Sequence, residues 1–139
     1  MGDRPPEYVP TRRPDDRWAV AYRIEDLATG GSFVYAPRVA AWTAALDDLL
    51  ATADCAVLDG TFFGADEVSV AGTGRPSRGH LPVTGPGGSL TALARHPGVR
   101  RIYTHLGNPN PLLDPGSTAR AQVNGAGVEV LMDGAEFVV

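Results

Sequence analysis

The alternation of apolar and polar positions predicts two strands near the start of the chain. Residues 18–26, WAVAYRIED, alternate as in a strand with one buried face. Residues 32–37, SFVYAP, repeat the pattern after the turn residues LATGG. We therefore expect a β-hairpin. Residues 39–53 change to helical spacing, with one apolar face made of Val39, Trp42, Leu46, Leu49 and Leu50.

The rest of the chain alternates short apolar runs with helical segments. Residues 55–60 and 99–106 are typical of buried strands. A helix is expected over residues 89–96, beginning after Pro86–Gly88, and another over 117–127 with Ser117 as its N-cap. The last twelve residues, VEVLMDGAEFVV, predict a second hairpin that turns at Asp133–Gly134.

This order of elements, β-β-α-β-α-β-α-β-β, predicts an α/β fold with a layered sheet. Residues 1–16 are polar and contain four prolines, so we expect a flexible lead-in there. Residues 17–139 have a length that fits one domain.

Composition and charge exclude several classes of partner. The net charge of −4 disfavours an electrostatic grip on nucleic acid or anionic lipid. No apolar run approaches the roughly 18–20 residues that span a bilayer, and the first residues lack the apolar core of a signal peptide. A single cysteine, Cys55, excludes an internal disulfide and a zinc site built on paired cysteines. We expect a cytoplasmic protein with no nucleic-acid or membrane partner.

Chemistry-bearing side chains gather where predicted strands end. Asp59 follows one buried strand, His105 ends another, and His80 lies in the loop region between them. Because reactive groups in α/β sheets collect at the carboxyl ends of strands, these three predict a metal or acid–base site. Each also has a structural explanation, an Asx turn for Asp59 and hydrogen-bonded packing for the histidines, and the residues alone leave both open.

A glycine-rich stretch follows His80. The segment GPGGSL, residues 85–90, begins a predicted helix and offers backbone N–H groups that could bind an anion. It lacks the Lys–Ser/Thr pair of a P-loop, so nucleotide binding is disfavoured.

Four stretches carry a resemblance to a known family. VLDGTFF, GHLPVTGPGGSL, THLGNPNPLLDPGS and AGVEVLMDGAEFVV occur in this order in the PqqB family, the B proteins of pyrroloquinoline quinone (PQQ) biosynthesis, and the match runs from about residue 9 to the end. The resemblance implies the C-terminal half of a metallo-β-lactamase-like αββα sandwich, with a mixed sheet and flanking helices.

The resemblance also implies roles for particular residues. Asp59 and His105 match metal ligands, and His80 matches a catalytic histidine that serves the metal or proton transfer. A divalent metal, iron or zinc, is expected, with an incomplete ligand set because the family's acid–histidine motif lies in its amino-terminal half. The expected substrate-pocket residues are Asn108, Asn110, Gly87 and Gly88.

The implied function is metal-dependent oxidation of a tyrosine-derived, peptide-derived or small-molecule PQQ precursor. A complementary N-terminal half or a second copy, giving a homodimer, would complete the metal site. Two alternatives stay open: a non-catalytic carrier that binds and transports PQQ or its precursor, and an inactive fragment of a metallo-β-lactamase-fold hydrolase. The sequence does not decide whether the chain is itself an enzyme.

Overall fold

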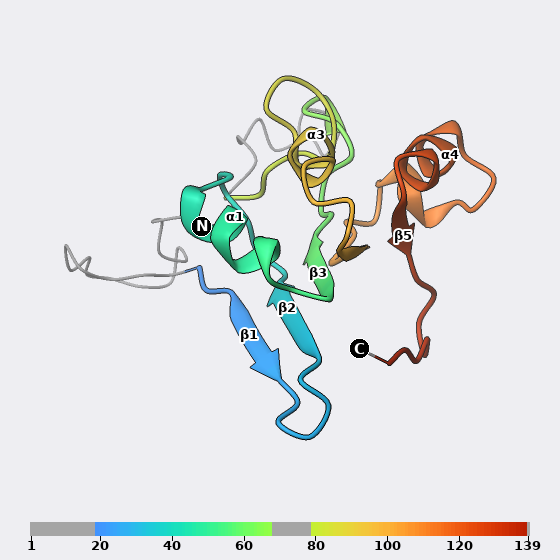
Figure 1. The fold of residues 1–139 in the computed structure, drawn as a ribbon. Helices are drawn as coiled ribbons and strands as arrows, with labels where there is room; N and C mark the ends of the chain where they lie inside the picture. The colour runs from blue at the N-terminus through green and yellow to red at the C-terminus, as the bar shows by residue number, and fades with distance from the viewer. Residues whose placement is uncertain (1–18, 68–78, 139) are drawn as a thin grey trace, which may run out of the picture.

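A five-stranded mixed sheet organises the protein (Figure 1). The computed structural model describes residues 19–67 and 79–138. The strands lie side by side in chain order, with the first pair antiparallel and every later pair parallel. Their bounds are β1 Tyr22–Glu25, β2 Ser32–Ala36, β3 Cys55–Asp59, β4 Arg100–Thr104 and β5 Val128–Val130. The predicted α/β fold is confirmed.

The first hairpin forms as the alternation predicts. Tyr22 pairs with Tyr35 and Glu25 with Ser32. In the turn, the Asp26 carboxylate accepts the Ala28 amide at 2.8 Å. This local hydrogen bond explains why a polar turn replaces the alternating pattern between the strands.

Within residues 19–67 and 79–138, the helices whose bounds the structure gives are α1 Ala44–Ala51, α3 Ser89–Leu93 and α4 Thr118–Gly125, with a 3-10 turn at Pro111–Leu113. The Ser117 hydroxyl accepts the Arg120 amide, so the predicted N-cap of α4 is confirmed. The first helix begins later than position 39, because Thr43 caps it by accepting the Leu46 amide. Val39 lies in the connection that precedes this helix.

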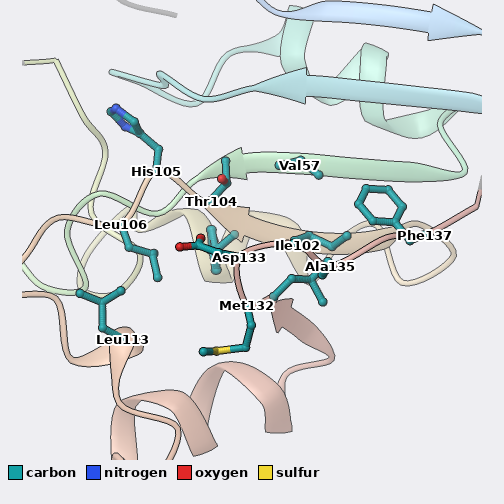
Figure 2. A pocket seen from close by; sticks show the side chains of 13 residues that line it. Val57, Ile102, Thr104, His105, Leu106, Leu113, Met132, Asp133, Ala135 and Phe137 are labelled. Atoms are coloured by element: carbon teal, nitrogen blue, oxygen red, sulfur yellow. The ribbon is translucent and has the colours of Figure 1, made fainter.

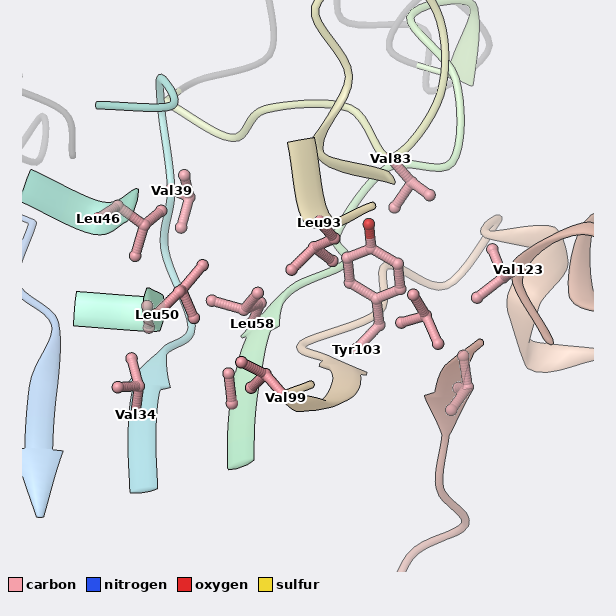
Figure 3. Close-up of a cluster of buried hydrophobic side chains, with 14 of the residues drawn as sticks. Val34, Val39, Leu46, Leu50, Leu58, Val83, Leu93, Val99, Tyr103 and Val123 are labelled. Atoms are coloured by element: carbon pink, nitrogen blue, oxygen red, sulfur yellow. The ribbon is translucent and has the colours of Figure 1, made fainter. Parts of the chain in front are cut away.

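All three helices bury their apolar residues against one face of the sheet (Figure 3). Leu46 and Leu50 of α1, Leu93 of α3 and Val123 of α4 belong to the same core cluster. The sheet contributes the alternate residues of its strands: Val34, Ala36, Ala56, Leu58, Tyr103, Val128 and Val130. Every residue of β3 is buried, as expected for a central parallel strand.

The opposite face of the sheet is also apolar. Cys55, Val57 and Ile102 form a second buried cluster there, with Phe33, Leu131 and Phe137 packed against it. In the described residues this cluster includes no helical residue. Farther out, cross-strand pairing places Tyr22 and Ile24 on the same face as Tyr35 and Phe33, and Tyr22, Ile24 and Tyr35 are exposed. We call this surface the open face.

The predicted closing hairpin is wrong. Within the described residues β5 ends at Val130, and residues 131–138 contain no strand. A turn does form, since Gly134 has φ 81° and the Ala135 amide donates to the Met132 carbonyl. The chain then places Phe137 on the open face, 6.0 Å from Phe33 between ring centroids. Burial of this aromatic ring replaces strand pairing.

Some sequence predictions fall on parts of the chain that the structure does not describe. The lead-in over residues 1–16 lies outside the described residues, as do residues 68–78 of the loop region that contains His80. Among the described residues, no helix has the length and apolar character needed to cross a membrane.

Candidate functional site

Parallel pairing brings the candidate residues to one edge of the sheet. Asp59, the last residue of β3, pairs with Thr104, the last residue of β4. His105 follows directly and has a positive φ of 59°, which is uncommon for a residue with a side chain. The predicted convergence of Asp59 and His105 at adjacent strand ends is therefore present.

Asp59 is a fully buried carboxylate with four hydrogen bonds. Its Oδ2 accepts the Val39 amide at 2.8 Å and contacts His80 Nδ1 at 2.7 Å. Its Oδ1 accepts the Thr61 amide at 3.1 Å and the Thr61 hydroxyl at 2.7 Å. Burial raises the pKa of Asp59, but the hydrogen bonds from His80, Val39 and Thr61 outweigh it and hold the pKa below 3.8. The carboxylate is thus ionised at neutral pH.

The two histidines lie next to each other but differ in exposure. Their ring centroids are 5.3 Å apart at an interplanar angle of 29°. The His80 side chain is 14% exposed and contacts Phe62 edge-on, whereas the His105 side chain is 55% exposed. His80 is therefore held in place, while His105 faces the solvent.

Thr61 is the residue at the centre of this group that the sequence analysis missed. Its hydroxyl lies 2.7 Å from Asp59 Oδ1, 3.1 Å from His80 Nδ1 and 2.8 Å from His105 Nδ1. The signal available in the sequence was a hydroxyl residue two positions after Asp59, where an Asx turn directs it back to the carboxylate.

Asp59, His80 and His105 could together hold a metal ion. One potential ligand atom from each lies within 4.8 Å of the other two. Ligand atoms of a tetrahedral ion with bonds of about 2.1 Å lie roughly 3.4 Å apart, so a modest contraction would bring them into range. One carboxylate oxygen and two imidazole nitrogens form a donor set that suits zinc or iron. The residues fit a divalent metal.

The two asparagines after His105 differ. Asn110 is buried, and its amide donates to the carbonyls of Gly60 and Thr61 at 2.6 and 3.1 Å. Its side chain therefore holds the backbone that follows Asp59. Asn108 is exposed and lies in the turn before it.

Three amides of the glycine-rich stretch are already hydrogen-bonded within the chain. The amides of Gly88, Ser89 and Leu90 donate to the carbonyls of Gly85, Pro82 and Val83. A side chain at Gly88 would bring its Cβ to 2.7 Å from the Val83 carbonyl oxygen, so Gly88 serves close packing. Gly87 is exposed, with φ 73°.

A depression of about 510 Å³ lies beside the site, between the open face and the C-terminal segment (Figure 2). His105 is at one end and Phe137 at the other. Its walls include Val57 and Ile102 of the sheet and Met132 of the C-terminal segment. Asp59, His80, Asn108, Asn110, Gly87 and Gly88 do not line it.

Comparisons with known proteins agree in family and in fold. A family model described as "Beta-lactamase superfamily domain" matches residues 4–106. Coenzyme PQQ synthesis protein B of Pseudomonas fluorescens (strain Pf0-1) is 39% identical over 140 residues, which cover 96% of this chain and 46% of the relative. The protein of the same name from Pseudomonas aeruginosa (strain LESB58) is 38% identical over 93% of this chain and 44% of the relative.

A solved structure extends this likeness. Zn²⁺-bound PqqB from Methylobacterium extorquens superposes with a TM-score of 0.73 at 35% identity, over 80% of this chain and 41% of that one. The chain thus spans less than half the length of the relatives that it matches.

Proposed function

The chain belongs to the β-lactamase superfamily. We propose that it supplies those ligands of a metal site that lie in the C-terminal half of the fold, and that this site acts in PQQ biosynthesis. The observation that carries the proposal is the meeting of Asp59, His80 and His105 within 4.8 Å of one another at the carboxyl edge of the sheet. Two supports come from relatives: curated proteins that match nearly the whole chain are named for PQQ synthesis, and the similar PqqB structure is zinc-bound.

In this proposal Asp59 and His105 are metal ligands and the metal is zinc or iron. A bound metal of this kind supplies Lewis-acid or redox chemistry to a substrate oxygen. His105 is the more exposed of the two ligands. The reaction is the oxidation of a tyrosine-derived PQQ precursor by an external oxidant such as dioxygen, since zinc itself accepts no electrons.

His80 is the catalytic residue that transfers a proton. Its Nδ1 lies against an ionised, fully buried carboxylate, which accepts a hydrogen bond from the ring and orients it. The side chain is 14% exposed, so a small part of it is accessible to a bound molecule. This pairing suits a group that takes a proton and returns it.

The open face supports the need for a partner. A sheet that buries one face under helices and leaves Tyr22, Ile24 and Tyr35 exposed on the other exposes apolar surface that a second layer would cover. The relatives have more than the same length again beyond the matched region. The proposed partner is a complementary half or a second copy that packs on the open face and adds the remaining metal ligands.

Metal analysis of the purified chain tests the site. Zinc and iron contents are measured after loading and desalting for the unchanged chain, Asp59→Asn and His105→Ala. Asp48→Asn and His96→Ala are matched controls, since Asp48 is exposed and neither residue belongs to the cluster. Loss of about one metal per chain in the first pair and none in the controls is expected. Equal metal content in all variants, with and without a candidate partner, would contradict the proposal.

A second candidate function is a non-catalytic carrier of PQQ or its precursor. The depression of about 510 Å³ favours it, because its volume falls in the range of small-molecule sites and His105 provides a polar group at its end. Calorimetry with PQQ distinguishes the two. Binding of PQQ that is independent of metal and weakened by Met132→Glu supports the carrier function. If no heat of binding is measured with or without metal, the chain is not a carrier of PQQ.

A further inference from the structure

We propose that the Thr61 hydroxyl fixes His105 in the tautomer that carries its proton on Nδ1, so that Nε2 is left with a free lone pair. Thr61 is then a positioning residue of the site, acting through His105. The tautomer itself follows from contacts within the chain. Its use in presenting Nε2 to a metal rests on the function proposed above.

The Thr61 hydroxyl has more neighbours than it has protons. Four polar atoms lie within hydrogen-bond distance: Asp59 Oδ1 at 2.7 Å, His105 Nδ1 at 2.8 Å, the His105 carbonyl oxygen at 3.0 Å and His80 Nδ1 at 3.1 Å. A hydroxyl donates one hydrogen bond and accepts two. The direction of each contact is therefore constrained.

Counting protons assigns these directions. Two of these neighbours, the Asp59 carboxylate oxygen and the His105 carbonyl oxygen, can only accept, and the single hydroxyl proton goes to one of them, with Asp59 Oδ1 the nearer. The hydroxyl then has no proton left for His105 Nδ1, and a contact of 2.8 Å between two bare acceptors would be repulsive. His105 Nδ1 must carry the proton and donate it to Thr61.

The same count applies to the other two histidines. His80 Nδ1 lies 2.7 Å from Asp59 Oδ2, so His80 also carries a proton on Nδ1. His96 has the reverse arrangement, because its Nε2 lies 2.8 Å from Asp47 Oδ1. The chain thus contains an internal reference for the opposite tautomer, outside the cluster of Asp59, His80 and His105.

The backbone around Thr61 keeps its hydroxyl in this position. The Thr61 amide donates to Asp59 Oδ1, and its carbonyl accepts from the Gly107 amide and from Asn110 Nδ2. His105, by contrast, is more than half exposed. Its ring is held by the Thr61 contact and by the stack on His80, so removing the hydroxyl would free it.

This arrangement matches what a metal-binding histidine requires. A ligating histidine donates its second ring N–H to a fixed acceptor, which sets the tautomer and the ring orientation. Loss of such an acceptor costs about 10–100-fold in metal affinity. The Thr61 hydroxyl would be this acceptor for His105. The same residue also donates a hydrogen bond to Asp59.

Histidine tautomers in the metal-free full chain test the proposal. Long-range ¹H–¹⁵N spectra are recorded with ¹⁵N-labelled histidine, at a pH where the signals are those of neutral rings. We expect the Nδ1–H pattern for His105 and His80 and the Nε2–H pattern for His96. In Thr61→Val, His105 alone shifts towards Nε2–H, and in Thr61→Ser it stays as Nδ1–H. An Nε2–H pattern for His105 in the unchanged chain, or no shift in Thr61→Val, overturns the proposal.

Zinc affinity, measured by competition with a chromophoric chelator, adds a second readout. Thr61→Val should bind about 10–100-fold more weakly than the unchanged chain, and Thr61→Ser should retain its affinity. Equal or tighter binding by Thr61→Val contradicts the positioning role. Absence of zinc binding by the unchanged chain, both alone and with a candidate partner, would remove the proposed function, while the tautomer spectra would still decide the role of Thr61.

Discussion

Asp59 and His80 form the buried anchor of the site, with 2.7 Å between Oδ2 and Nδ1 and no solvent exposure of the carboxylate. The two residues are 21 positions apart in the chain. Their contact joins the end of the central strand β3 to the loop that precedes α3. The position of His80 is therefore fixed by the sheet as well as by its own loop.

Asn110 should matter for stability and Asn108 should not. Asn110→Ala removes the buried side-chain donor to the Gly60 carbonyl and one of the two donors to the Thr61 carbonyl, which should lower the free energy of unfolding by about 2–3 kcal/mol. Asn108→Ala removes an exposed side chain and should change it by less than about 0.5 kcal/mol. Urea denaturation of both variants checks this. A similar fall in the free energy of unfolding in both variants would show that the contacts of Asn110 with the two carbonyls do not stabilise the fold.

Two glycines give a second matched pair. Gly88→Ala forces a Cβ to 2.7 Å from the Val83 carbonyl oxygen, so the free energy of unfolding should fall by about 1–3 kcal/mol. Gly98→Ala meets nothing within 4 Å and should change it by less than about 1 kcal/mol. Thermal unfolding followed by circular dichroism measures both. If Gly88→Ala leaves the free energy of unfolding unchanged, the turn can relax and close packing does not explain why a glycine is present.

Features of the fold that depend on contacts between residues close together in the chain could be predicted from the sequence, and features that depend on particular contacts between distant residues could not. The β1–β2 hairpin and the Ser117 cap follow from local patterns, and both are present. The meeting of Asp59 and His105 follows from a general property of parallel strands. Phe137 breaks the predicted closing hairpin because its burial depends on a face built by β2 to β4, which no local pattern contains.

Only part of the candidate site could be predicted from the sequence. Asp59, His80 and His105 are charged or titratable residues, and such residues attract notice in a sequence. Thr61 is an ordinary turn residue until the fold brings both histidines to its hydroxyl. The structural role of Asn110 likewise depends on carbonyls 50 and 49 positions earlier in the chain.

Asp47 should make stability depend on acid pH. Burial raises the pKa of Asp47, but hydrogen bonds from His96, Trp42 and Arg95 outweigh it and lower the pKa to about 2 from the usual 3.8. Because the folded-state pKa is depressed, the stabilisation is complete above pH 3.8 and is lost as the pH falls towards about 2.

The test compares the unchanged chain with Asp47→Asn by urea denaturation across this pH range. The stability difference between the two should shrink steadily as the pH falls from about 4 to about 2. A difference that stays constant over this range would show that the carboxylate charge does not contribute.

The open face should drive association. Ile24 and Tyr35 are exposed there, so the double variant Ile24→Glu, Tyr35→Glu should shift the chain towards monomer in sedimentation velocity. Leu27→Glu is the control, because Leu27 is almost fully exposed in the β1–β2 turn, away from the sheet. A monodisperse monomer for the unchanged chain, or equal association in all variants, would contradict a partner layer on this face.

The most direct test of the central claim is X-ray absorption spectroscopy of the full chain loaded with one equivalent of zinc, alone and with any partner that binds the open face. The account predicts a first shell of nitrogen and oxygen at about 2.0–2.1 Å that includes imidazole scattering. This imidazole scattering should weaken in His105→Ala and stay unchanged in His96→Ala. A spectrum of aqueous zinc, or one that His105→Ala leaves unaltered, would contradict a metal site built on Asp59 and His105.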